Sequence, residues 1–127
     1  MHQEQISTNT PWEEMAGYSR AIRVDNRIFV SGTSASDANG IVQHVGDAGA
    51  QTTFILSKIE AALLQIGSSL SDVVRTRIYV QRIEDWEVVA RAHGEVFADI
   101  RPASTLVRAA PIEPQMLVEI EADALIT

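Results

Sequence analysis

The spacing of apolar residues divides the chain into strands and helices. Alternation of apolar and polar residues predicts extended strands, whereas apolar residues three and four positions apart predict amphipathic helices. Five segments alternate, and the turn residues Asp25 and Asn26 join the first two as a hairpin. The expected strands are residues 21–25, 28–32, 73–81, 105–109 and 116–125.

Two segments have helical spacing. Residues 47–66 and residues from about 85 to about 97 each carry one apolar stripe. Asp47 is a suitable N-cap, and Gly67 suits the position just after the first helix. Pro102 disfavours helical geometry at the residue before it and separates the second helix from the next strand.

The predicted order is β-β-α-β-α-β-β, which indicates an α+β fold. Two helices of this length would cover one face of a single mixed sheet. The other face would carry charges of both signs, among them Arg75, Arg77, Glu119 and Glu121. An uncovered, mixed sheet face in a small protein favours self-association with ion pairs between subunits.

The length of 127 residues suits one domain. Residues 1–16 are polar and carry an acidic pair, which indicates a partly ordered N-terminal arm. The periodic pattern begins after that, so residues 17–127 are expected to form the single domain.

Composition narrows the classes of function. The net charge is −7, and Lys58 is the only lysine, so a nucleic-acid partner is not expected. There are no cysteines, and the three histidines show no metal-ligand spacing, so neither a metal nor a cofactor is expected. No apolar run could span a membrane and the N-terminus lacks a secretory pattern, so the cytoplasm is the expected location.

Several short motifs, in collinear order, resemble the RidA/YjgF family. Residues 17–21 (Gly-Tyr-Ser-Arg-Ala) are similar to that family's Pro-Tyr-Ser-Gln-Ala, and residues 29–32 (Phe-Val-Ser-Gly) to its Val-Ser-Gly strand end. Residues 67–74 resemble the loop and strand start after the first helix. Arg-Pro-Ala at 101–103 and Val-Glu-Ile-Glu-Ala at 118–122 complete the match.

The resemblance implies a chorismate-mutase-like fold and a homotrimer whose sheets face the trimer core. It also implies ligand clefts between neighbouring subunits, in which some members deaminate enamines and imines. In those members an arginine holds the substrate carboxylate, and a glutamate helps to place the attacking water. A small carboxylate ligand is therefore expected.

Four positions match the residues that the family uses in its cleft. Tyr18, Ser31 and Gly32 are expected to bind the substrate, and Glu119 is the candidate catalytic acid or base. Tyr18 could instead be an interface aromatic residue, and Glu119 could instead pair with an arginine of a neighbouring strand.

Three positions depart from the family together. Ser104 replaces the carboxylate-binding arginine, Ala90 stands where many members have asparagine, and His93 where they have tyrosine. His93 is either a neutral acid or base in the cleft, or a satisfied core or interface residue. The combination indicates a subgroup with another ligand.

The positive charge that Ser104 lacks could come from another residue. Arg77, in the middle of a strand, is the first candidate, although it could instead form a salt bridge with Glu119 or Glu121; Arg108 is the second. Ser104 and Thr105 would still offer hydroxyl donors to a polar ligand.

Two functions remain open at this point. One is hydrolysis of a small unsaturated amino or keto acid, in which Glu119 would act on a bound water. The other is a non-catalytic trimer that binds a metabolite or regulates a partner. A third, ribonuclease activity, is claimed for some family members, but the acidic charge balance disfavours it.

Overall fold

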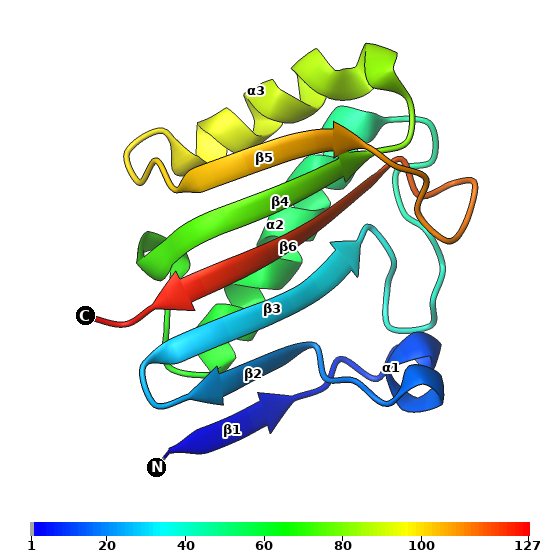
Figure 1. Ribbon diagram of the computed structural model, residues 1–127. Helices are drawn as coiled ribbons and strands as arrows, with labels where there is room; N and C mark the ends of the chain where they lie inside the picture. The colour runs from blue at the N-terminus through cyan, green and yellow to red at the C-terminus, as the bar shows by residue number, and fades with distance from the viewer. Residues whose placement is uncertain (1) are drawn as a thin grey trace.

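The computed structural model describes residues 2–127 as a six-stranded sheet with helices packed against it (Figure 1). The two long helices are α2 (Ala48–Gln65) and α3 (Trp86–Phe97), and α1 (Pro11–Ala16) is a single short helix near the N-terminus. Two 3-10 turns, Leu70–Asp72 and Ile83–Asp85, precede β4 and α3. The elements are β1 (Gln3–Ile6), α1 (Pro11–Ala16), β2 (Ala21–Val24), β3 (Arg27–Ser34), α2 (Ala48–Gln65), β4 (Val73–Val80), α3 (Trp86–Phe97), β5 (Ala103–Arg108) and β6 (Val118–Leu125).

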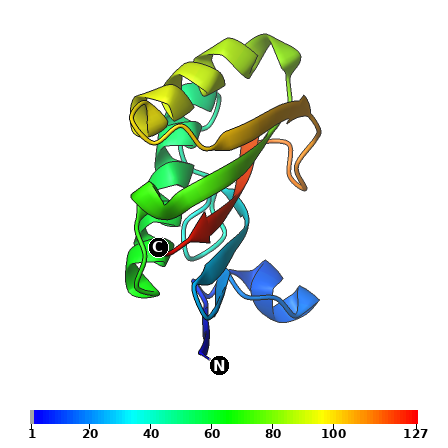
Figure 2. The same cartoon turned by 60° about the vertical axis from the view of Figure 1, so that its left-hand side comes forward.

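The sheet has the order β1-β2-β3-β6-β4-β5. All neighbouring strands are antiparallel except β4 and β5, which run parallel because α3 crosses over between them. Figure 2 shows both long helices on one side of the sheet. The predicted α+β class, with one mixed sheet and two helices on one face, is confirmed.

The core lies between the sheet and the two long helices. Val118, Ile120, Ala122 and Ala124 of β6 are buried, as the alternation predicts, and they pack with the apolar stripe of α2. The side chain of Asp47 accepts a hydrogen bond from the backbone N–H of Ala50, which confirms the predicted N-cap.

In β4, the prediction of which side chains face the core is wrong at Val74. Strict alternation along β4 predicts that Val74, Thr76, Ile78 and Val80 face the core together, but Val74 is exposed and Val73 is buried instead. The β4–β6 pairing shifts register between Val73 and Arg75, and such an irregularity changes which side chains face the core.

The polar N-terminus is folded onto the sheet, contrary to the arm that the sequence predicts. β1 pairs with β2 along its whole length, and Ile6 is buried. In α1, Glu13 is buried, and the chain leaves this helix through Gly17, whose φ of 76° suits glycine. The N-terminal residues therefore extend the sheet and close one end of its uncovered face.

No helix among residues 2–127 has the length and apolar character required to cross a membrane.

Candidate functional site

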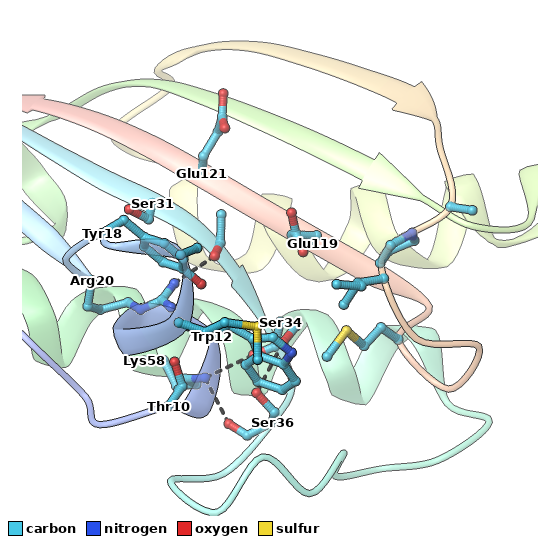
Figure 3. Close-up of a pocket in the computed structure, with 17 residues that line it drawn as sticks. Thr10, Trp12, Tyr18, Arg20, Ser31, Ser34, Ser36, Lys58, Glu119 and Glu121 are labelled. Atoms are coloured by element: carbon cyan, nitrogen blue, oxygen red, sulfur yellow. Dashed lines mark hydrogen bonds between the residues drawn. The ribbon is translucent and has the colours of Figure 1, made fainter.

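A cavity of about 770 Å³ lies on the sheet face opposite the two long helices (Figure 3). Its walls come from α1, the end of β3, the start of β6 and the loop before β6. Lys58 of α2 reaches it at the end of β3, where its Nζ contacts the carbonyls of Ser34 and Ser36. Four residues expected from the sequence line it together: Tyr18, Ser31, Gly32 and Glu119. The cavity is also lined by Arg20, Ser34, Ser36, Lys58 and Glu121.

Gly32 is in close contact with Glu119 inside this cavity. A Cβ at position 32 would lie 2.7 Å from Oε2 of Glu119, which is closer than real Cβ atoms approach other atoms. The β3–β6 pairing shifts register between Val30 and Thr33, so that Gly32 falls within an irregular stretch of β3. The missing side chain at Gly32 is what allows the Glu119 carboxylate to occupy this place.

The Glu119 carboxyl group is half-buried and electrostatically perturbed. Burial raises its pKa, the nearby Glu121 raises it further, and the positive charge of Arg20 opposes both. Among residues 2–127, no hydrogen bond to the Glu119 side chain is formed. Its oxygens therefore remain available to a ligand or a water molecule in the cavity.

Arg20 is a buried cation beside this carboxylate. Its Nη1 donates to the carbonyl of Gly32 at 2.6 Å and to Oγ1 of Thr33 at 3.1 Å, and its Nη2 lies 3.5 Å from Oε2 of Glu13. The Nε of Arg20 is buried and finds no partner among residues 2–127. These contacts hold the guanidinium in place at the cavity wall.

Glu13 neutralises Arg20 and is itself held by hydroxyl groups. Burial opposes ionisation of Glu13, but hydrogen bonds from Thr8, Thr10 and Ser7 outweigh it and lower the pKa to about 2. The Arg20–Glu13 pair is thus a permanent charge pair under one end of the cavity.

Lys58 brings a second cation to the cavity. Its Nζ donates to the carbonyl oxygens of Ser34 at 3.0 Å and Ser36 at 2.8 Å (Figure 3). Burial, and after it the charge of Arg20, lower the pKa of Lys58 to about 8. At neutral pH most of this amine is protonated.

Tyr18 and Ser31 complete the polar lining. The guanidinium carbon of Arg20 lies 5.7 Å from the centre of the Tyr18 ring, within the range of a cation–π contact. The hydroxyl of Ser31 donates to the carbonyl of Ser19 at 2.7 Å, so its lone pairs face away from that bond.

The two arginines considered as substitutes for the family arginine do not line this cavity. Arg77 lies 3.2 Å from Oε1 of Glu121 and 3.4 Å from Oδ2 of Asp123, so it forms the salt bridge that was its alternative assignment. Arg108 is the last residue of the edge strand β5. Thr105 lies on the same strand and pairs with Arg77 of β4. Neither Arg108 nor Thr105 reaches the cavity.

Ser104 and His93 belong to a second polar cluster. Nε2 of His93 lies 2.9 Å from Oγ1 of Thr76, which in turn donates to Oγ of Ser104 at 2.8 Å. The His93 ring packs against Phe97 with the ring centres 4.6 Å apart, and burial lowers its pKa. His93 is therefore mainly neutral at pH 7 and connects α3 to the edge of the sheet.

The two clusters lie on opposite faces of the same sheet. Thr76 is fully buried under the helices, and Ser104 pairs with it in the β4–β5 ladder. Glu119 alternates with the buried Val118 and Ile120 and so faces the uncovered side. Ser104 and Glu119 of one chain therefore cannot contact the same small ligand.

Residues 2–127 contain no group of three histidine, aspartate or glutamate side chains placed as metal ligands. The cavity offers two cations, two carboxylates and several hydroxyls, which can bind a small polar organic ligand.

Sequence reasoning missed Arg20 and Lys58. Arg20 stands within the Gly-Tyr-Ser-Arg-Ala motif where the family has glutamine, and this change was a usable signal. Lys58 flanks the apolar stripe of α2, and nothing in its local pattern distinguishes it from a solvated helix lysine.

Comparison with known proteins agrees with the fold and with the family resemblance. The sequence profile of the family described as "Endoribonuclease L-PSP" matches residues 8–126. The chain is 37% identical over 106 residues to the 3-aminoacrylate deaminase RutC of Acinetobacter baylyi, covering 84% of each protein.

Two solved structures of related proteins have the same fold. The crystal structure of Rv2704 from Mycobacterium tuberculosis, a member of the YjgF/YER057c/UK114 family, is 42% identical with a TM-score of 0.89. The match covers 98% of this chain and 100% of the other. The YjgF gene product of E. coli is 25% identical with a TM-score of 0.83, and the match covers 98% and 99% of the two chains.

Proposed function

This chain belongs to the Endoribonuclease L-PSP family, the family of YjgF and RidA proteins, and from that premise we propose that it hydrolyses a small enamine or imine acid. The products would be ammonia and the corresponding oxo acid. The observation that carries the proposal is Glu119: a half-buried carboxylate to which no residue of 2–127 donates a hydrogen bond, inside a cavity with two cations.

The reaction needs one group that accepts and returns a proton. In the imine tautomer, water attacks the carbon of the C=N bond, Glu119 takes a proton from that water, and the proton passes to nitrogen. The resulting carbinolamine loses its hydroxyl proton through Glu119 to the nitrogen. The C–N bond then breaks, ammonia leaves and the carbonyl forms. The raised pKa of Glu119 suits this role, because a pKa closer to the operating pH lets one group both accept a proton and return it.

The name of one relative supports this class of substrate. RutC of Acinetobacter baylyi is named a 3-aminoacrylate deaminase, and it shares 37% of residues over most of both chains. The cavity, of about 770 Å³, has ample volume for a molecule of that size. The arginine that deaminases of the family use for the substrate carboxylate is Ser104 here, so 2-aminoacrylate, the family's usual imine precursor, is not the expected best substrate.

A second copy of the chain is part of this proposal. Because Ser104 and His93 lie on the face opposite Glu119, they can join its ligand only from a neighbouring subunit. The uncovered sheet face carries half-exposed Phe29 and Val107, which suit burial against another subunit. A homotrimer with a cleft at each subunit boundary, as the family resemblance implies, meets both requirements.

The test is ammonia release from 2-aminoacrylate and 3-aminoacrylate, each generated in situ, with ligand-induced stabilisation measured in parallel. We expect one of them to turn over, and Glu119→Gln to lower kcat by about 100- to 10,000-fold. Glu87→Gln is the matched control, because that carboxylate is exposed on α3, pairs with Arg91 and does not line the cavity, so its loss should leave kcat nearly unchanged. If compounds stabilise the protein but remain chemically unchanged, the non-catalytic binding function replaces this proposal.

A further inference from the structure

Lys58, the only lysine of the chain, projects from the middle of α2 into the cavity. It is half-buried, and its ammonium group is fixed by the carbonyl oxygens of Ser34 and Ser36. A protonated amine has three N–H donors, and these two acceptors use two of them. The third donor remains for another partner.

No carboxylate of residues 2–127 lies within 4 Å of the Lys58 ammonium. The two acids that act on it electrostatically are Glu13 and Asp37, and both are committed elsewhere. Glu13 holds Arg20 and the hydroxyls of its own segment. Lys58 is therefore a half-buried cation whose contacts are neutral carbonyl groups. An anion bound in the cavity would supply the counter-charge that its partly desolvated ammonium group lacks.

Asp37 stabilises its own loop rather than Lys58. Its Oδ1 accepts from the backbone N–H groups of Asn39 at 2.9 Å and Ile41 at 3.0 Å, and its Oδ2 from the side chain of Gln43 at 3.3 Å. A carboxylate held by three such donors keeps its charge, which acts on Lys58 at longer range, but its oxygens make no direct contact with the ammonium group.

We propose that Lys58 binds the carboxylate of the substrate and so takes the role of the arginine that Ser104 replaces. This inference rests on the proposed function, because it names the substrate class of the same cavity: a small monocarboxylate whose reacting carbon faces Glu119. The anchor then comes from the same subunit as Glu119, through α2.

Arg20 strengthens the same end of the cavity. Its charge acts on both Lys58 and Glu119, so it lies within electrostatic range of each. Because its guanidinium is tied to Gly32, Thr33 and Glu13, it supplies a fixed positive potential and not a movable ligand. Lys58, with a free donor, makes the direct contact.

The test compares crotonate with crotonamide, a planar unsaturated acid and its neutral amide of the same shape. Dissociation constants are measured by ligand-observed NMR for the full-length wild type, Lys58→Gln and Lys58→Arg. We expect Lys58→Gln to weaken crotonate binding by about 10- to 100-fold, the usual loss for a charge-assisted hydrogen bond. Lys58→Arg keeps most of the affinity, and crotonamide binds the wild type and Lys58→Gln equally.

Equal crotonate affinity in the wild type and Lys58→Gln would overturn the inference, as would equal binding of crotonate and crotonamide to the wild type. An unchanged melting temperature of Lys58→Gln shows that the variant is folded. Turnover is a separate measurement: if no enamine acid is hydrolysed while crotonate binding still depends on Lys58, the proposed hydrolysis fails and the anchor stands. If Glu119→Gln abolishes turnover while Lys58→Gln leaves KM and crotonate affinity unchanged, the anchor fails and the hydrolysis stands.

Discussion

Gly32 and Glu119 fit together so closely that a Cβ at position 32 would lie 2.7 Å from Oε2 of the glutamate. The two residues come from neighbouring strands, β3 and β6, at the point where their register shifts. The contact fixes where the carboxylate stands in the cavity. A substitution at position 32 should therefore change activity more than it changes folding.

Gly32→Ala should reduce turnover without unfolding the protein. The atom that the new methyl group meets is the end of a flexible side chain, so Glu119 can move aside at little cost in stability. The displaced carboxylate no longer faces the substrate, and we expect kcat to fall by about 100-fold, as misplacement of a catalytic group by about 1 Å does.

Gly94→Ala is the matched control, since no atom of residues 2–127 would lie within 4 Å of a Cβ at that exposed position in α3. It should raise stability by about 0.5–1 kcal/mol and leave kcat unchanged. A Gly32→Ala protein with wild-type kcat would contradict the assignment of Glu119.

The pH dependence of activity should report the raised pKa of Glu119. The carboxylate form accepts the proton from water, so kcat falls as pH decreases through a pKa above the ordinary value of 4.5. Because the folded state holds this proton more tightly than the unfolded state, Glu119 lowers stability as pH rises through the same range. Glu119→Gln should therefore melt at a higher temperature than the wild type at pH 7, measured by calorimetry, although it is inactive.

Binding of crotonate should weaken as pH rises through about 8. Lys58 is charged below that pH and neutral above it, and Arg20, Glu13 and Asp37 are the charged groups that act on it. Affinity should be constant from pH 6 to 7 and then fall in the wild type. In Lys58→Arg it should stay constant to pH 9, because arginine remains charged. The same decline in both proteins would assign the pH effect to another group.

The buried Arg20–Glu13 pair should be essential to stability. Both side chains are almost completely buried, with 4% and 3% of their surface exposed. Glu13→Gln leaves the guanidinium without its counter-charge and should lower the free energy of unfolding by about 3–5 kcal/mol, measured in urea.

Acid unfolding gives a second measurement of the same pair. The pKa of Glu13 is lowered to about 2, so its contribution is present above the ordinary value of 4.5 and is lost as pH falls towards 2. Glu13→Gln should lose less stability than the wild type across that range. Equal losses would mean that other carboxylates dominate acid unfolding.

Local sequence patterns were sufficient to predict most of the fold. The alternation in β6 and the stripe in α2 each bury a continuous apolar face, so periodicity alone determines which residues enter the core. β1 and α1 could not be predicted in the same way. They are polar, and they are held by strand pairing and by Glu13, whose partner Arg20 lies seven residues further along the chain.

The site was only partly predictable for a similar reason. Tyr18, Ser31, Gly32 and Glu119 were found through motifs, and they do share one cavity. Lys58 enters that cavity from α2, and its burial depends on carbonyl groups more than twenty residues away in sequence. No local pattern carries that information.

We propose above all that Glu119 acts in a cleft completed by the Ser104 edge of a neighbouring chain. Ser104 is exposed, so Ser104→Trp can fill the cleft without disturbing the core, and it should be inactive, as should Glu119→Gln. The most direct measurement is ammonia release after the two inactive variants are unfolded together in equal amounts and refolded. In a randomly mixed homotrimer, about one cleft in four combines an intact Glu119 with an intact Ser104, so activity should return to roughly a quarter of the wild-type level. A mixture as inactive as its two components, or a Ser104→Trp protein with wild-type activity, would contradict the account.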